Sequence, residues 1–217
     1  MKVAVVASGD LDPTDATMLD EADLVIAADG GATALDRLGR RPDRLVGDLD
    51  STDPSLVERL AAAGTQVERH PTDKDASDAE LAIAAAMAAG ADEIVLLGAT
   101  GGDRLDHGIA NLLLLADPAL AGRDVRLVHS STTVRVLRGG ERMILVGGAR
   151  DTVSLLPIGG DATGVRTEGL RWELDGDAVT MGRARGLSNE VVTAPASVRL
   201  ERGTLLVVET AARGAPA

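Results

Sequence analysis

The sequence predicts an α/β domain over residues 1–130 and a small all-β domain over residues 131–217. In the first part, short runs of Val, Ile and Leu alternate with segments of helical spacing. Such alternation is typical of parallel strands joined by crossover helices. After residue 130 only short strand-like runs remain, separated by glycine-containing turns. We therefore expect a mostly parallel, Rossmann-like sheet followed by a small β-sandwich.

The elements of the first part follow from apolar runs and their spacing. Several expected strands are continuous apolar runs, as in sheets that are covered on both faces. The expected strands are residues 2–8, 23–29, 44–48, 66–70, 93–98 and 124–130. The expected helices are residues 17–22, 31–39, 55–64, 78–90 and 105–117.

The second part contains no helical stretch of useful length. We place the domain boundary at the sequence HSST, residues 129–132, and expect a loose tail from residue 211. The expected strands are residues 132–137, 142–146, 152–158, 164–174, 178–182, 191–195, 197–203 and 204–210.

Composition limits the possible functions. The formal net charge is −12 and no basic cluster occurs, so nucleic acid is not an expected partner. The absence of Cys excludes disulfides, thiolate zinc sites and a cysteine nucleophile. The longest weakly polar run, residues 81–91, is shorter than the roughly 20 residues that a membrane span needs. The first residues also do not resemble a signal peptide. We expect a soluble, cytoplasmic protein without a membrane partner.

Acidic residues follow several of the expected strands. Asp29 ends one run, Asp48 and Asp50 follow the next, and Asp78 lies beyond a third. Because ligands bind at the carboxyl ends of parallel strands, these side chains should share one edge of the sheet. Carboxylates that lie so close together need a cation, and hard oxygen ligands suit Mg²⁺.

Structural roles could also explain the same residues. Asp78 could cap the helix that follows it, and Ser77 could do so equally well. Asp48 and Asp50 could belong to an ordinary turn. His107, at the start of an expected helix, is more typical of a structural histidine than of a catalytic one. The joint placement of the acidic residues on one edge favours a functional site.

Glycines before Arg104 and after Asp29 permit close approach of the backbone to a ligand. Loops that contain Gly30, Gly31, Gly101 and Gly102 could present N–H groups to phosphate oxygens. The chain has neither a Walker A loop nor a GxGxxG motif after its first strand. A bound nucleotide would therefore be held in another way.

Trp172 is the single aromatic residue of the chain. An indole could stack on a flat ring of a ligand, or it could fill the core of the β domain. The sequence alone does not decide between these two roles.

Seven segments in order resemble the thiamine pyrophosphokinase (thiamine diphosphokinase) family. They are ADGGA at 28–32, GDLDS at 47–51, DKDASDAELAI at 73–83, GATGGDRLDHGIANLLLL at 98–115, SLLPIGG at 154–160, GLRWEL at 169–174 and GLSNE at 186–190. The resemblance implies transfer of the pyrophosphoryl group of ATP to the hydroxyl of thiamine, which gives thiamine diphosphate and AMP. It also implies a homodimer whose active site lies at the subunit interface, between an ATP- and Mg²⁺-binding catalytic domain (1–130) and a thiamine-binding domain (131–217).

The resemblance also assigns roles to individual residues. Mg²⁺ would be held by Asp48, Asp50 and Asp78. Arg104 would steady the transferring phosphates, with Asp106 as its partner or as a contact to substrate. ATP and its phosphates would be bound by Asp29, Lys74, Ser77, Gly101 and Gly102. Thiamine would stack on Trp172 and accept or donate hydrogen bonds at Ser188 and Asn189.

Two segments depart from the family pattern. The chain has GGDRLDH where the family usually has GGRLDH, so Asp103 is an additional residue in the glycine loop. At the domain junction the chain has HSSTTV in place of the usual Asp and Asn. Two other functions remain open: a pyrophosphokinase for another heterocyclic alcohol such as a pterin, and a non-catalytic sensor of thiamine or nucleotide.

Overall fold

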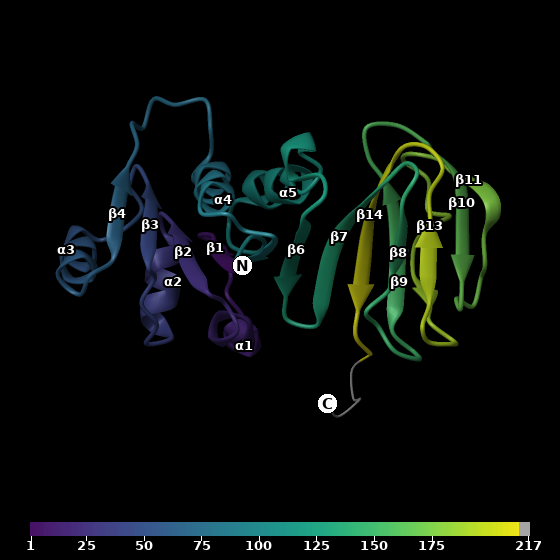
Figure 1. The fold of residues 1–217 in the computed structure, drawn as a ribbon, viewed down its shortest axis with the longest axis horizontal. Coiled ribbons are helices and arrows are strands. Elements are labelled where there is room, and N and C mark those ends of the chain that lie inside the picture. The colour runs from purple at the N-terminus through teal and green to yellow at the C-terminus, as the bar shows by residue number, and fades with distance from the viewer. Residues whose placement is uncertain (213–217) are drawn as a thin grey trace. The chain divides into compact units, whose positions relative to one another are not determined.

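The computed structural model describes residues 1–212, and it divides into two compact units, 1–130 and 131–217 (Figure 1). Most of the predicted loose tail, residues 213–217, lies outside the described part. A sheet domain with helices is followed by a separate antiparallel β domain, as the sequence predicted.

The first unit contains six strands in the order β6-β5-β1-β2-β3-β4. Every pair of neighbours within this set is parallel. The bounds are β1 Lys2–Val6, β2 Leu24–Ala28, β3 Arg44–Gly47, β4 Gln66–Arg69, β5 Glu93–Leu97 and β6 Asp124–His129. All carboxyl ends of these strands therefore meet at one edge of the sheet.

The connections between these strands are helical. The helices are α1 Ala16–Asp20, α2 Gly31–Arg37, α3 Pro54–Ala62, α4 Asp78–Ala88 and α5 Leu105–Leu114. Two short 3₁₀ helices, η1 Pro13–Asp15 and η2 Pro118–Leu120, were not predicted from the sequence. Each of these helices begins with a proline that follows an aspartate. The aspartate side chain accepts a hydrogen bond from the backbone N–H two residues further on and so caps the helix, which favours a tight first turn.

Helices cover both faces of the central strands. Residues Val3–Val6 of β1 are buried in succession, although successive side chains point to opposite faces. On one face, Ala4 and Val6 pack in a cluster with Leu35 of α2 and Leu60 of α3. Helix α4 packs on β1, β2 and β3 through a small-residue face that contains Ala82 and Ala86. The small side chains bring the start of α4 close to the carboxyl ends of β2 and β3.

The second unit consists of two antiparallel sheets. Their orders are β12-β9-β14-β7 and β11-β10-β13-β8. The bounds are β7 Thr132–Arg138, β8 Arg142–Ile144, β9 Thr152–Pro157, β10 Ala162–Glu168, β11 Asp175–Val179, β12 Asn189–Glu190, β13 Ser197–Arg199 and β14 Thr204–Thr210. Leu155 and Val207 of one sheet and Val165 and Val198 of the other belong to one buried apolar cluster.

Three expected strands of this unit differ from the structure. The run at 178–182 is displaced, because β11 is Asp175–Val179 and ends at its second residue. Residues 164–174 do not form one strand, because β10 ends at Glu168 and the chain turns at Gly169. Gly169 has φ +78°, and a Cβ there would lie 2.4 Å from the carbonyl oxygen of Thr193. Residues 191–195 form no strand and contribute a single bridge, between Val191 and Leu170. Apolar runs predicted strands here, but the tight glycine turn ends the ladder.

A buried ion pair crosses the second unit. Arg135 of β7 donates to Oε1 of Glu209 on β14 at 2.6 Å, and Glu209 is buried. The other oxygen of Glu209 accepts from the backbone N–H groups of Val146 and Gly147. These contacts satisfy a charge that would otherwise be costly to bury.

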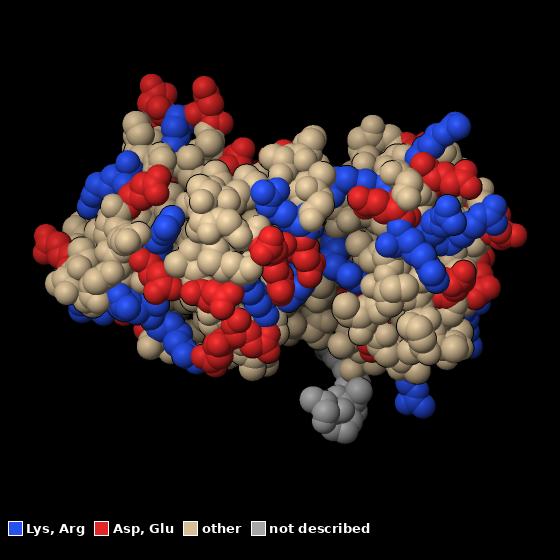
Figure 2. Space-filling model, viewed as in Figure 1, with Lys and Arg blue, Asp and Glu red and all other residues tan. Residues whose placement is uncertain are grey.

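Most other charges lie at the surface. Figure 2 shows acidic and basic side chains intermixed over the face that is drawn. Exposed pairs such as Arg59–Asp36 and Arg40–Asp20 contribute little to stability, because water screens them. Within residues 1–212, no helix has both the length and the apolar character that crossing a bilayer requires.

Candidate active site

A cavity of about 440 Å³ lies at the carboxyl edge of the parallel strands in the first unit. The segments that line it follow β1, β2, β3 and β5 and begin α4 and α5. Most of the predicted catalytic and phosphate-binding residues line this cavity: Asp29, Asp48, Asp50, Lys74, Ser77, Asp78, Gly101, Gly102 and Arg104. Asp106 does not line it and contacts Arg104 instead.

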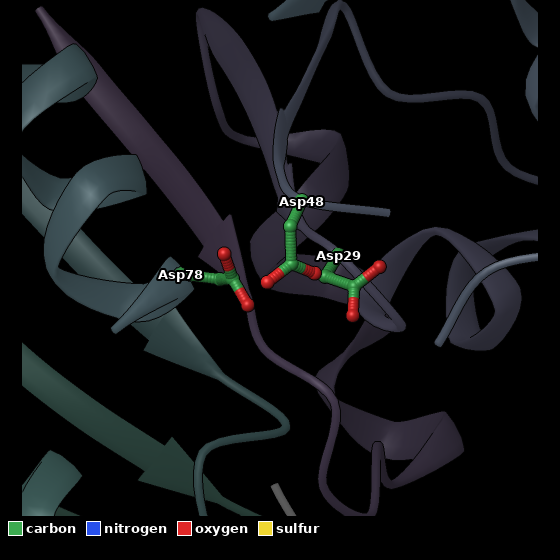
Figure 3. Close-up of side chains that lie close together, drawn as sticks. All are labelled: Asp29, Asp48 and Asp78. Carbon is green, nitrogen blue, oxygen red and sulfur yellow. The ribbon is translucent and has the colours of Figure 1, made fainter. Parts of the chain in front are cut away.

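Three carboxylates meet in this cavity. Asp29 follows β2, Asp48 follows β3 and Asp78 is the first residue of α4. One oxygen from each lies within 4.8 Å of the others, and the close-up in Figure 3 shows the three side chains close together. Oxygen ligands at this spacing fit a hard divalent cation such as Mg²⁺.

Asp29 is the most buried of the three, with 3% of its surface exposed. Thr52 donates a hydrogen bond to its Oδ1 at 3.0 Å. Burial raises the pKa of the Asp29 carboxyl despite hydrogen bonds from Thr52 and Ser51. Asp29 also has φ +40°, a conformation that Asp tolerates better than most residues. A buried, desolvated carboxylate of this kind gains strongly from a nearby cation.

Gly47 makes room for the three carboxylates at the end of β3. Its φ is +147°, and a Cβ there would lie 2.9 Å from Oδ1 of Asp78 and 3.1 Å from Cβ of Asp29. Any side chain at this position would therefore push Asp29 and Asp78 apart. The glycine of the GDLDS segment is explained by this contact.

Lys74 supplies a cation within the cluster. Its Nζ donates to Oδ2 of Asp48 at 2.8 Å. It also lies 3.1 Å from Oδ1 of Asp78, an ion pair whose angles do not meet hydrogen-bond geometry. The hydrogen bond from Lys74 lowers the pKa of Asp48, and the same bond raises the pKa of Lys74. The buried Oδ1 of Asp78 otherwise has no hydrogen-bond partner among the described residues.

Ser77 caps helix α4, and Asp78 does not. The Ser77 hydroxyl accepts from the backbone N–H of Glu80, and the Glu80 carboxylate accepts from the backbone N–H of Ser77. This reciprocal pair is a capping box. Because Ser77 satisfies the helix terminus, the Asp78 carboxylate can point towards Asp29 and Asp48. The ambiguity between the two residues is thereby resolved.

Asp50 lies at the cavity without joining the close group of carboxylates. Its backbone N–H donates to Oδ1 of Asp48 at 3.2 Å, and its own Oδ1 accepts from the Ser51 hydroxyl at 3.0 Å. Leu49, between the two aspartates, has φ +65° and is buried. This turn directs Asp48 and Asp50 differently, so Asp29 occupies the place in the cluster that the sequence assigned to Asp50.

The glycine loop leads from β5 to Arg104 at the start of α5. Arg104 donates two hydrogen bonds to the Asp106 carboxylate, at 3.0 Å from Nε and 2.7 Å from Nη2. These hydrogen bonds lower the pKa of Asp106 to about 2 and raise the pKa of Arg104. Both side chains are exposed, so Arg104 stays accessible to an anionic ligand. His107 also lines the cavity.

A second cavity, of about 400 Å³, lies within the β unit. The three residues predicted to bind thiamine, Trp172, Ser188 and Asn189, all line it. Trp172 is 60% exposed, which excludes the alternative of a core tryptophan. The guanidinium carbon of Arg171 lies 5.6 Å from the centroid of the indole ring.

Asn189 differs from its expected role in one respect. Its side-chain amide donates to the carbonyl of Trp172 at 2.7 Å and accepts from the N–H of Trp172 at 3.1 Å. Both ends of the amide therefore hold the Trp172 backbone. Asn189 supports the position of the indole, while the neighbouring Ser188 has φ +55° at the cavity wall.

Three residues that line the cavity or support its lining were not found from the sequence. Asp10, which follows β1, bonds to the glycine loop, and Asn111 of α5 donates to the carbonyl of Ala99 at 2.8 Å. Thr52 supports Asp29. The SGD segment after the first expected strand lies at the same edge and could have indicated Asp10. Nothing in the sequence indicated Asn111 or Thr52.

Comparison with known proteins agrees with these two sites. The family model described as "Thiamin pyrophosphokinase, catalytic domain" matches residues 16–127. The model described as "Thiamin pyrophosphokinase, vitamin B1 binding domain" matches residues 143–205.

Individual relatives match over nearly the whole chain. The thiamine pyrophosphokinase of Bacillus subtilis (strain 168) is 26% identical over 210 residues, which cover 96% of this chain and 98% of that protein. A crystal structure of thiamine pyrophosphokinase from Bacillus subtilis gives a TM-score of 0.84 at 25% identity and covers 97% of this chain and 99% of its own. The structure of the Geobacillus thermodenitrificans protein gives 0.81 at 27% identity, with 99% of both chains covered. The chain belongs to the thiamine pyrophosphokinase family.

Proposed function

We propose that this protein transfers the pyrophosphoryl group of ATP to the hydroxyl of thiamine, giving thiamine diphosphate and AMP. The observation that carries the proposal is the cavity in which Asp29, Asp48 and Asp78 converge beside Lys74 and Arg104. Carboxylates and cations gathered at the carboxyl edge of parallel strands suit a polyphosphate with its metal ion. Membership of the family supports thiamine as the acceptor.

Mg²⁺ is the metal that fits the carboxylates of the cavity. Asp48 and Asp78 would hold it together with Asp29 or Asp50, since both of these line the same cavity. Oδ1 of Asp78 supports this assignment, because it is buried and has only the ion pair with Lys74 and no hydrogen bond among the described residues. A bound Mg²⁺ would neutralise phosphate charge and favour attack at phosphorus.

The chain's own residues would bind and orient the reacting groups. Arg104, whose guanidinium is exposed at the cavity, can form paired hydrogen bonds with phosphate oxygens. Gly101 and Gly102 let the backbone approach the phosphates closely, and Lys74 adds positive charge. Phosphoryl transfer depends on positioning and charge neutralisation, so these roles account for catalysis without a covalent intermediate.

Trp172 would stack on thiamine in the second unit. Its exposed indole lies at a cavity, and the Asn189 amide fixes its backbone at two atoms. Ser188 would hydrogen-bond the aminopyrimidine. The first unit is then the catalytic domain, with a mostly parallel Rossmann-like sheet, and the second is a thiamine-binding β-sandwich.

The assembly follows from the same family resemblance. The protein would act in the cytoplasm as a homodimer, with each active site at the subunit interface. Two copies would then provide two equivalent sites, as expected for a twofold-symmetric dimer.

³¹P NMR of the purified protein with ATP, Mg²⁺ and thiamine tests the proposed reaction. We expect AMP and thiamine diphosphate to appear together, in a thiamine-dependent manner. ADP with thiamine monophosphate would keep the acceptor and overturn one-step pyrophosphoryl transfer. Failure of thiamine to change the spectrum, in a folded sample, would overturn the proposed acceptor.

A further inference from the structure

We propose that Asp10 is a positioning residue that holds the glycine loop, residues 98–102, in the shape that binds the phosphates of ATP. This inference rests on the proposed function, since it concerns the same cavity. Asp10 lies outside the segments that matched the family motifs, and its position after β1 brings it to the same edge of the sheet.

Asp10 contacts the glycine loop through both its backbone and its side chain. The backbone N–H of Asp10 donates to the carbonyl of Thr100 at 2.9 Å. The Asp10 Oδ2 accepts from the backbone N–H of Gly102 at 3.1 Å. One residue earlier, the N–H of Gly9 donates to the carbonyl of Gly98 at 2.6 Å. Three hydrogen bonds thus tie the segment after β1 to the loop after β5.

The two segments are also in close steric contact. A Cβ at Gly101 would lie 2.4 Å from Oδ2 of Asp10, and a Cβ at Gly9 would lie 2.5 Å from the carbonyl oxygen of Thr100. Gly101 and Gly102 have φ of +82° and +70°. Glycine is the most flexible residue in this conformation, so an external contact is needed to define the loop.

The loop that Asp10 holds carries the residues that face the cavity. Gly101, Gly102, Asp103 and Arg104 all line it. Asn111 also holds the loop through the carbonyl of Ala99, from a buried position on α5. Two side chains therefore contact the loop backbone, and the Asp10 carboxylate is the exposed one of the two.

If Asp10 acts through its negative charge, its variants should change ATP binding in a different direction than if it acts by positioning the glycine loop. As an anion near a phosphate site, Asp10 would weaken ATP binding, and removing its charge would tighten it. As a hydrogen-bond acceptor for Gly102, it would strengthen ATP binding by ordering the loop beforehand. Asn keeps an acceptor oxygen at the same distance from the backbone, whereas Glu keeps the charge and moves the oxygen.

The test compares Asp10→Ala, Asp10→Asn and Asp10→Glu, with Asp103→Asn as the matched control. Asp103 is an exposed carboxylate in the same loop, so its variant removes the same charge. For Asp10→Ala we expect the KM for ATP to rise by about 5- to 10-fold, which corresponds to the net contribution of a typical intramolecular hydrogen bond. Asp10→Glu should be similarly impaired. The KM for thiamine should not change.

Asp10→Asn should stay within about twofold of the unmodified protein, which corresponds to less than half a kcal/mol. Asp103→Asn measures what the loss of one negative charge at the cavity does by itself. An unchanged or lowered KM for ATP in Asp10→Ala would overturn the proposal. If Asp10→Ala, Asp10→Asn and Asp103→Asn all changed the KM for ATP equally, the proposal would also be overturned, because the effect would then come from the loss of charge.

Amide hydrogen exchange gives a readout that does not depend on activity. We expect peptides covering residues 98–104 to exchange faster in Asp10→Ala than in the unmodified protein and in Asp10→Asn. Unchanged exchange there would contradict the inference even if ATP turnover were altered. If the unmodified protein formed no thiamine diphosphate, the proposed function would fail separately, and exchange would still decide the role of Asp10.

Discussion

At the scale of single residues, the cavity combines carboxylates in different environments. Asp29 is buried and has a raised pKa, whereas the hydrogen bond from Lys74 lowers the pKa of Asp48. Such opposed shifts are typical of functional sites, because stability alone favours paired or exposed charges. The contrast suggests that Asp29 is retained at a cost to folding for what it does in the cavity.

A panel of single variants separates the candidate metal ligands. We compare Asp29→Asn, Asp48→Asn, Asp50→Asn and Asp78→Asn by the Mg²⁺ concentration that gives half-maximal turnover. Because even indirect contacts change metal affinity by roughly 10- to 100-fold, each true ligand should raise this concentration more than about tenfold. We expect this for Asp48 and Asp78. The third ligand is then Asp29 or Asp50, whichever variant raises the Mg²⁺ concentration more. An unchanged Mg²⁺ concentration in both Asp48→Asn and Asp78→Asn would contradict the metal assignment.

Asp15, which lies outside the cavity, should make the free energy of unfolding depend on pH. It is buried, and burial raises its pKa although Ser130 N–H donates to its Oδ1; Asp12 and His129 are its other charged or titratable neighbours. A raised folded pKa means that stability is lost as pH rises through the range between the unfolded value, about 3.9, and the folded value. Asp15→Asn removes that loss.

The measurement for Asp15 is the free energy of unfolding by urea at pH 3 and at pH 7. We expect the difference between Asp15→Asn and the unmodified protein to move in favour of the variant as pH rises. The Asn side chain can also change the free energy of unfolding by the same amount at both pH values, and this part cancels when the two pH values are compared. A difference that stays constant between the two pH values would show that Asp15 titrates normally.

The sequence predicted which residues reach the cavity better than it predicted their contacts. The positions after strands brought Asp29, Asp48 and Asp78 to one edge, because parallel strands share that edge. It did not predict that the turn at Leu49 separates Asp50 from Asp48, nor that Asn189 is bonded to Trp172. Turn conformation and side-chain hydrogen bonds depend on contacts between distant segments, which spacing does not encode.

At the scale of elements, the start of α4 links helix stability to the site. Ser77 and Glu80 satisfy the first turn of the helix, and Asp78 is the next residue after the cap. The position of Asp78 beside Asp29 and Asp48 therefore depends on where the helix begins. A local capping box sets the geometry of a site that is assembled from distant parts of the chain.

Ser77→Ala tests this link. Loss of the cap should lower the free energy of unfolding by about 1 kcal/mol, within the usual range for a helix N-cap. Urea denaturation measures this change, with Ser77→Thr as a control that keeps the hydroxyl. If Ser77 also contacts phosphate, the KM for ATP should rise in Ser77→Ala and recover in Ser77→Thr. An unchanged free energy of unfolding would contradict the capping role.

Elements were predictable where pattern and turn chemistry agreed. The helices α2 to α5 and the parallel strands match the predicted ranges to within a few residues, because apolar periodicity and glycine ends coincide there. In the β unit, the runs at 164–174 and 191–195 have the residue pattern of strands, but the first is a strand only up to Glu168 and the second forms no strand. The close approach of Gly169 to Thr193 ends pairing there, and such a contact is visible only in the folded chain.

At the scale of the whole molecule, the chain has two units with different chemistry. The net charge of −12 arises in residues 1–130, where the acidic cavity lies, because residues 131–217 carry nearly equal numbers of acidic and basic side chains. The exposed indole of Trp172 and its cavity belong to the second unit. If the proposed homodimer forms its sites at the subunit interface, each site takes one set of residues from each copy.

Mixing two defective variants tests that arrangement directly. Asp48→Asn alters the first unit and Trp172→Ala the second, and Trp172→Ala is assayed at a thiamine concentration at which it alone is slow. After equal mixing with subunit exchange, about half of the dimers are mixed, and an interface site leaves one of their two sites unaltered. We therefore expect about a quarter of the unmodified activity to return. Sites formed within one copy would give no recovery, because every copy then carries a defect in its own site.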